Sequence, residues 1–141
     1  GEPLPDAALL FYGVYSADHQ TESHRQCGGG QFGLSSQKMA WYRQLYLSGQ
    51  RHDPMDPRVS PVVADLRGLP PMYLNAAALD CLRDDSVLLA RRLAEAGVPH
   101  QFQIVPGVTH GFMQMSRELP EALQAFRDAA AFVTALLPSA I

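Results

Sequence analysis

Two short apolar runs and one alternating segment along the chain predict three β-strands. Residues Ala7 to Tyr15 form an apolar and aromatic run after Pro5, and Met72 to Leu79 form a second run. Apolar runs of this length, bounded by turn residues, are typical of strands buried on both faces. Residues Gln101 to Val105 alternate between polar and apolar side chains. That alternation predicts a third strand.

Segments whose apolar residues have helical spacing lie between and after these expected strands. Residues 35–47 predict a helix capped by Ser35 or Ser36. Residues 84–96 predict a second helix that begins with an aspartate cap and ends before Gly97. Its expected buried stripe consists of Leu89, Leu93 and Ala96.

A third helix is expected from Pro120 to Leu137. Its expected buried face consists of Leu123, Phe126, Ala130, Val133 and Leu137. The polar, glycine-rich residues 16–33 predict a loop, and five prolines in residues 51–71 predict an extended connection. Strands that alternate with helices indicate an α/β fold with a parallel sheet of about three strands and flanking helices.

Composition narrows the class of protein. The 141 residues are enough for one domain, and 47% hydrophobic with 18% charged residues is ordinary for a globular chain. The net charge of −3 and the lack of a basic stripe argue against nucleic acid and anionic membranes as partners. No apolar run is long enough for a membrane-spanning helix.

The two cysteines, Cys27 and Cys81, do not make a disulfide framework in a chain of this size. We therefore expect a reduced, cytoplasmic setting. Residues 1–6 lack the charged-then-apolar pattern of a signal peptide. We interpret them as a linker or as the result of a cut inside a larger protein.

Two chemically active side chains follow two of the expected strands. Asp80 comes directly after the second strand, and His110 follows the third strand 30 residues later. The carboxyl ends of parallel strands meet at one edge of a sheet, where functional groups gather. A carboxylate there can accept the Nδ1–H of an imidazole and fix its tautomer. The alternatives for Asp80 are a helix cap, for which Asp84 and Asp85 are better placed, and a surface carboxylate.

Four segments resemble one known family, the hormone-sensitive-lipase-like bacterial esterases of the α/β-hydrolase superfamily. Ser60 to Pro71 (SPVVADLRGLPP) is similar to the family's SP-x-x-A-D-L-x-G-L-P-P, and Asp80 to Asp84 (DCLRD) to its D-P-L-R-D. Ala94 to Pro99 and Pro106 to Phe112 (PGVTHGF) resemble its next helix end and its H-G-F segment. The resemblance implies that residues 1–141 are the C-terminal portion of an α/β-hydrolase fold, a single partial domain.

The resemblance also implies an activity, the hydrolysis of small acyl esters of carboxylic acids through an acyl-serine. Asp80 would orient His110, which would act as general base and then as general acid, with no cofactor and no metal. The family's H-G-G-G segment and G-D-S-A-G elbow are absent from these residues. Ser16, after the first strand, is followed by no clear helix, so it does not fit a nucleophile elbow. The chain by itself is therefore expected to be inactive.

The partners implied are a small acyl-ester substrate and either the N-terminal half of the same fold or a second chain. A homodimer is also among them, because the family commonly uses its last strand and C-terminal helix for dimer contacts. The alternative function is a non-catalytic half-domain that serves as an interaction module, since a three-stranded sheet leaves an edge open.

Other motifs carry weaker hypotheses. Gly28, Gly30 and Gly33 match the spacing of a dinucleotide fingerprint, but the polar segment before them is no strand. The cluster of His19, His24 and Cys27 fits no standard zinc spacing, so solvated loop residues are the simpler interpretation. The remaining candidates, expected to be packed core residues rather than site residues, are Trp41, Tyr42, Tyr46 and Cys81.

Overall fold

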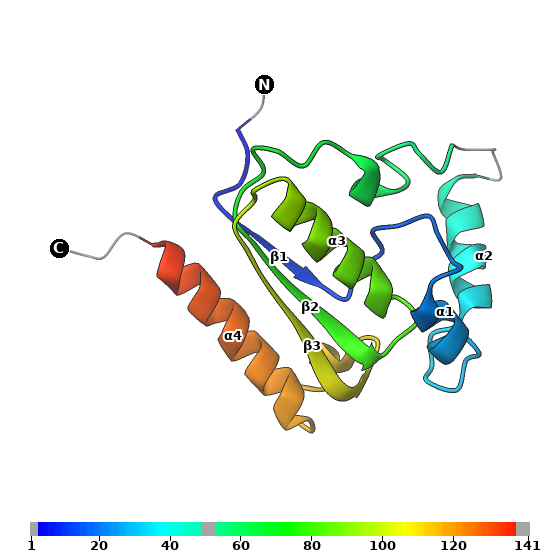
Figure 1. The fold of residues 1–141 in the computed structure, drawn as a ribbon. Coiled ribbons are helices and arrows are strands. Elements are labelled where there is room, and N and C mark those ends of the chain that lie inside the picture. Colours follow the sequence, from blue (N-terminus) through cyan, green and yellow to red (C-terminus); the bar gives the residue numbers. More distant parts are fainter. Residues whose placement is uncertain (1–2, 49–52, 138–141) are drawn as a thin grey trace.

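The computed structural model describes residues 3–48 and 53–137. Its centre is a parallel sheet of β1 (Ala8–Phe11), β2 (Met72–Leu79) and β3 (His100–Thr109), in that spatial order. Figure 1 shows the three strands side by side with helices around them. The predicted α/β class, with three parallel strands and flanking helices, is confirmed. The predicted limits of the second strand agree with those of β2, and β3 is longer at both ends than expected.

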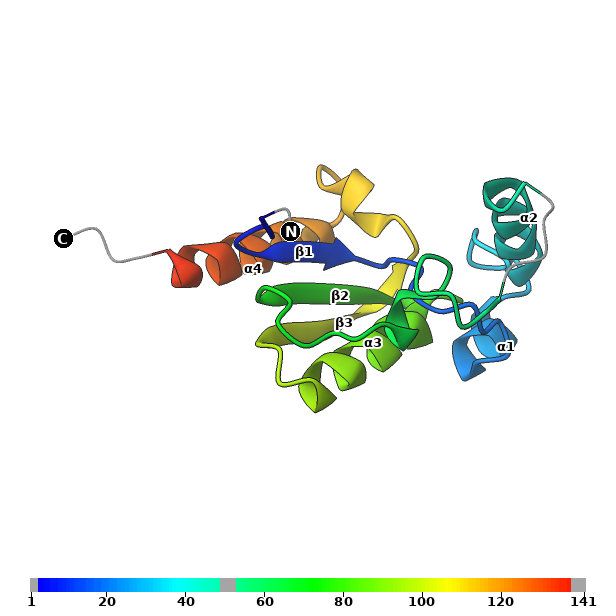
Figure 2. The same cartoon turned by 90° about the horizontal axis from the view of Figure 1, so that it is seen from above.

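Helices cover both faces of the sheet. Figure 2 shows α3 (Arg83–Glu95) on one side and α4 (Pro120–Leu136), with the short 3-10 helix η2 (Phe112–Met115), on the other. Successive side chains of β2 pack alternately against the helices on the two faces of the sheet. Leu74 belongs to the core under α3, and the neighbouring Tyr73 ring lies 5.9 Å from the Phe132 ring of α4. Cover on both faces explains why every residue of β2 except Asn75 is apolar.

The core under α3 follows the predicted stripe, because Leu89 and Leu93 are buried and Ala96 packs against them. The start of the helix differs from the prediction. Its N-cap position is Leu82, which makes no side-chain capping bond. The two aspartates 84 and 85 lie inside the first turn, where their carboxylates bind backbone N–H groups of other segments.

The buried face of α4 was predicted incorrectly. Its buried residues are alanines: Ala122, Ala125 and Ala129. The Leu123 and Phe126 side chains of the predicted face are 43% and 46% exposed, and Leu137 is also exposed. Two of these alanines pack with Ala77, Val105 and Phe112. The small side chains, and not the large ones, therefore form the face of α4 that packs on the sheet.

Two helices precede β2. The first, α1 (Glu22–Cys27), occupies part of the predicted loop, and the second, α2 (Ser36–Tyr46), was predicted. The cap is Ser35, whose hydroxyl accepts the Lys38 N–H at 3.1 Å. Trp41, Tyr42 and Tyr46 were expected in the core, yet they are 53%, 45% and 74% exposed.

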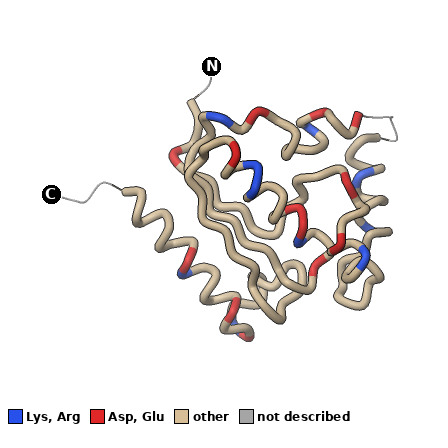
Figure 3. The backbone as a smooth tube through the Cα atoms, viewed as in Figure 1, with Lys and Arg blue, Asp and Glu red and all other residues tan. Residues whose placement is uncertain are grey.

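The predicted extended connection is described from residue 53 onward and consists of turns with one 3-10 helix, η1 (Pro61–Val63); residues 51–52 lie outside the described part. None of the described helices is long and apolar enough to cross a membrane. Figure 3 shows that charged residues lie on helices and loops, whereas the three strands carry none. The first acidic residue after β2 is therefore conspicuous: it is Asp80.

Candidate active site

The two predicted site residues meet at the carboxyl ends of β2 and β3. His110 Nδ1 lies 2.8 Å from Oδ2 of Asp80. The second carboxylate oxygen, Oδ1, accepts the Leu82 N–H at 3.0 Å. An ionised carboxylate can only accept hydrogen bonds, so Nδ1 carries the proton that it donates to Asp80. The carboxylate thus fixes the tautomer in which the other ring nitrogen, Nε2, has a free lone pair.

Burial differs between the two partners. The Asp80 side chain is fully buried, whereas the His110 side chain is 32% exposed. Directly after the histidine, Gly111 has φ 78, a left-handed conformation that glycine adopts without strain. The chain turns there into η2. A buried acceptor therefore holds an imidazole that reaches the surface.

One contact of the site was not predicted. The Tyr12 ring lies 4.9 Å from the His110 ring, with an interplanar angle of 65°. Tyr12 directly follows β1, so all three strands send a residue to this place. In the sequence it is hidden within an apolar run, and no feature of that run marks it as part of a site.

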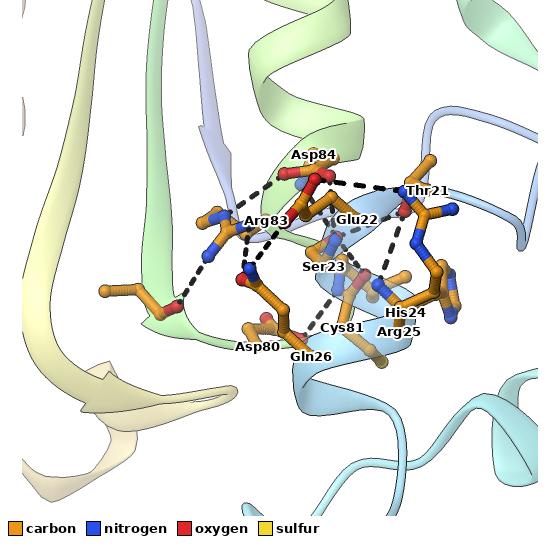
Figure 4. A network of polar contacts seen from close by, with 12 residues as sticks. Thr21, Glu22, Ser23, His24, Arg25, Gln26, Asp80, Cys81, Arg83 and Asp84 are labelled. Atoms are coloured by element: carbon orange, nitrogen blue, oxygen red, sulfur yellow. Dashed lines mark hydrogen bonds and ion pairs between the residues drawn. The ribbon is translucent and has the colours of Figure 1, made fainter.

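The turn that carries Asp80 is fastened to α1 by a buried serine. The hydroxyl of Ser23 donates to the Cys81 carbonyl at 2.6 Å and accepts the Asp84 N–H at 3.2 Å. The Ser23 N–H in turn donates to the Asp84 carboxylate at 2.8 Å. Figure 4 shows these bonds joining α1 to Cys81, between β2 and α3, and to Asp84 in the first turn of α3. The short helix therefore has a structural task that its polar sequence did not reveal.

A second aspartate fastens the loop after β1. One carboxylate oxygen of Asp85 accepts the N–H groups of Tyr15 and Ser16 at 2.8 and 2.9 Å. Its other oxygen is buried and has no hydrogen-bond partner within the described residues. Burial raises the pKa of this carboxyl to about 6, although the two backbone bonds oppose the rise. The start of α3 is thus tied to the chain that leaves β1.

Several weaker candidates are structural. Burial raises the pKa of the Cys81 thiol to about 12, so this cysteine is a packed side chain, as expected. Ser16 is buried, and its hydroxyl accepts the Asp18 N–H at 3.0 Å. No helix starts at this serine, since α1 begins six residues later. The strand–turn–helix geometry of a nucleophile elbow is absent there.

The histidine and cysteine cluster differs from the expectation of solvated loop residues. His24 and Cys27 are buried on α1, and His24 Nδ1 lies 2.7 Å from the Ser36 hydroxyl. The rings of His19 and His24 stack at 4.8 Å. Across residues 3–48 and 53–137, no three His, Cys, Asp or Glu side chains are grouped so that they could hold a metal ion.

The glycine motif lies in the wrong context for a dinucleotide. Gly28 is the C-cap of α1, and the motif therefore follows a helix instead of a strand. A Cβ atom at Gly28 would collide with the Ser36 hydroxyl and the His24 carbonyl. This glycine is explained by the close approach of α1 and α2.

Comparison with known proteins identifies the family. A family model described as "alpha/beta hydrolase fold" matches residues 1–114. The chain belongs to the α/β-hydrolase family, and its resemblance to the hormone-sensitive-lipase-like esterases is confirmed by solved structures.

Three solved structures show the likeness. An ester-hydrolase from the metagenome of Lake Arreo, complexed with a bipyridine phosphonate derivative, is 32% identical over 93% of this chain with a TM-score of 0.81. A thermostable esterase from Pseudomonas putida is 28% identical over 91% with a TM-score of 0.79. A hormone-sensitive lipase from a metagenome library is 25% identical over 96% with a TM-score of 0.87. The matches span only 41%, 41% and 46% of those chains, respectively.

Proposed function

We propose that this chain supplies the Asp and the His of a Ser-Asp-His triad in a carboxylic-ester hydrolase that acts on small acyl esters. The observation that supports the proposal is the 2.8 Å bond between His110 Nδ1 and buried Asp80. It leaves Nε2 unprotonated on a ring that is exposed to a third of its surface. That arrangement is what a general base requires.

In the proposed reaction, Nε2 of His110 takes the hydroxyl proton of a serine as the serine oxygen attacks the ester carbonyl. Asp80 stabilises the imidazolium that forms, without taking its proton. The imidazolium then protonates the leaving alcohol, and an acyl-serine remains. Water repeats the same steps to release the carboxylic acid and to restore the serine and the neutral imidazole.

The serine is expected to come from outside these residues. The sequence contains no G-x-S-x-G motif, so the nucleophile would be contributed by the N-terminal half of the same fold or by a second chain. The 141 residues by themselves are expected not to hydrolyse esters. We place the protein in the cytoplasm, a proposal supported by two buried cysteines that are both free.

A chimera tests the proposal. The N-terminal part of the Lake Arreo ester-hydrolase, with its own nucleophile, would be fused to this chain in place of the matching segment. Hydrolysis of p-nitrophenyl acetate is expected, and Asp80→Asn or His110→Ala should each lower kcat by about 10³-fold or more. His100→Ala, at the other end of β3, is the matched control and should keep full activity. A folded chimera without turnover, or one indifferent to both changes, would overturn the proposal.

The chain itself tests the source of the nucleophile. After incubation with a fluorophosphonate, mass spectrometry of the unmodified 141 residues is expected to show no adduct. A single adduct on a serine, accompanied by ester turnover, would contradict our assignment of the nucleophile to another segment.

The alternative function, a non-catalytic interaction module, rests on the sheet edges. Within the described residues, β1 and β3 each pair with β2 alone, so each has one unpaired side. A stable complex with a second copy of the chain, measured by sedimentation and unchanged by His110→Ala, would favour this module or a homodimer. A monomer at all concentrations would exclude the homodimer and any module that works by pairing with a second copy.

A further inference from the structure

Tyr12 sits in a costly backbone conformation. Its φ is 39, and only one other non-glycine residue of the described chain, Ser48, also has a positive φ. A bulky residue in the left-handed region is strained, because its Cβ atom comes too close to the backbone carbonyl oxygen. Such strain persists only where the surroundings hold it, and it gathers at functional sites.

The backbone around Tyr12 is firmly held. Its N–H donates to the Asn75 carbonyl at 2.8 Å, a bond that belongs to the last β1–β2 pair, Phe11 with Asn75. The conformation therefore begins where the ladder ends. Beyond this point the Tyr12 ring meets His110 and Phe112, which both follow the carboxyl end of β3.

The contacts of the ring are aromatic. It lies 4.9 Å from the His110 ring and 5.7 Å from the Phe112 ring, with interplanar angles of 65° and 60°. Phe112 is fully buried, so it supports Tyr12 from the core. Edge-to-face geometry at these distances is a favourable arrangement for aromatic pairs.

A single hydrogen bond does not fix an imidazole. The bond from Nδ1 to Asp80 sets the position of one ring atom, but the ring plane can still swing about the axis of that bond. A flat ring packed against the imidazole removes this freedom. The bond and the ring contact come from different strands, so together they define where Nε2 points.

We propose that Tyr12 is a positioning residue for His110, whose aromatic ring fixes the imidazole plane while Asp80 fixes its tautomer. The proposal rests on the function proposed above, in which Nε2 of His110 must be aimed at a serine. It requires the ring of Tyr12 and gives no task to its hydroxyl. Burial raises the pKa of that hydroxyl, so the ring stays neutral at ordinary pH.

The test uses NMR on the 141-residue chain with ¹³C,¹⁵N-labelled histidine. In the wild type, His110 is expected to show the tautomer protonated at Nδ1 and a high order parameter for its ring C–H groups, as a fixed imidazole plane requires. Tyr12→Phe should keep both signatures. Tyr12→Leu should keep the tautomer, because Asp80 is unchanged, and should lower the order parameter. Tyr42→Leu, on the exposed face of α2, is the control and should change neither.

A folding defect is controlled by a second variant. Tyr12→Gly removes the ring and relieves the positive φ, so it is expected to fold and still to show the lowered order parameter. A wild-type order parameter in Tyr12→Leu or Tyr12→Gly would overturn the proposal, and so would a Tyr12→Phe order parameter as low as that of Tyr12→Leu. These spectra report how the ring is held and require no turnover. An inactive chimera would therefore count against the esterase function and leave this result standing.

Discussion

Asp85 and Ser16 are joined across 69 residues of chain by a 2.9 Å bond from the Ser16 N–H to the buried Asp85 carboxylate. The neighbouring Tyr15 N–H donates to the same oxygen. The carboxylate therefore acts as a fixed point for the loop that leaves β1, at the cost of keeping a charge away from water.

The first prediction concerns pH. Burial raises the folded-state pKa of Asp85 to about 6, so the folded chain binds this proton more tightly than the unfolded chain does. The stabilising contribution is complete below the unfolded pKa near 3.8 and is lost as the pH rises through 6. Asp85→Asn cannot ionise. Between pH 4 and pH 8 its free energy of unfolding should therefore rise by on the order of 2–3 kcal/mol relative to that of the wild type.

The measurement is denaturant unfolding of both proteins across that pH range. Asp6 is exposed, so Asp6→Asn provides the matched control. The difference in unfolding free energy between this variant and the wild type should not change with pH. A difference between Asp85→Asn and wild type that does not change with pH would contradict the prediction.

The second prediction concerns the fastening of α1. Ser23→Ala removes the donor to the Cys81 carbonyl and the acceptor of the Asp84 N–H, so two backbone groups lose their partner. The free energy of unfolding should fall by about 1–3 kcal/mol. Urea titration measures the change. Ser116→Ala is the control, because Ser116 is partly exposed. An equal loss of unfolding free energy in both variants would contradict the prediction.

The third prediction separates the two apolar faces. Leu93→Ala on α3 empties a fully buried position and should cost about 2–5 kcal/mol. Leu123→Ala on α4 changes a side chain that is 43% exposed and should cost about 1 kcal/mol or less. Unfolding curves of the two variants check the assignment of the α4 core to alanines. A larger loss of unfolding free energy for Leu123→Ala than for Leu93→Ala would contradict this assignment and would mean that the leucine face of α4 is the buried one.

The fourth prediction is chemical. Cys81 is fully buried, and its raised pKa, about 12, leaves almost no thiolate at neutral pH. Ellman's reagent should therefore label the native chain only as fast as it opens, and two thiols should react at once in guanidinium. Ala131→Cys on the exposed side of α4 is the positive control. Rapid labelling of native Cys81 would show an activated thiol.

The sequence predicted what depends on local pattern. The limits of β2 follow from a run that is apolar except for Asn75, and the meeting of Asp80 with His110 follows from the ends of adjacent strands. The face of α4 was missed because periodicity alone does not rank an alanine stripe above a leucine and phenylalanine stripe. Tyr12 and Asp85 were missed because their partners lie far away along the chain.

The register of the sheet also carries a kinetic consequence. Met72 pairs with both Ala8 and His100, and the chain between Met72 and His100 is less than half as long as the chain between Ala8 and Met72. The β2–β3 ladder is also longer than the β1–β2 ladder. Closing the shorter loop costs less chain entropy and yields more pairs. We expect the transition state for folding to contain β2, α3 and β3, with β1 docking afterwards. The position of Tyr12 beside His110 would then be among the last features to form, and φ-values at Leu93 should exceed those at Leu10.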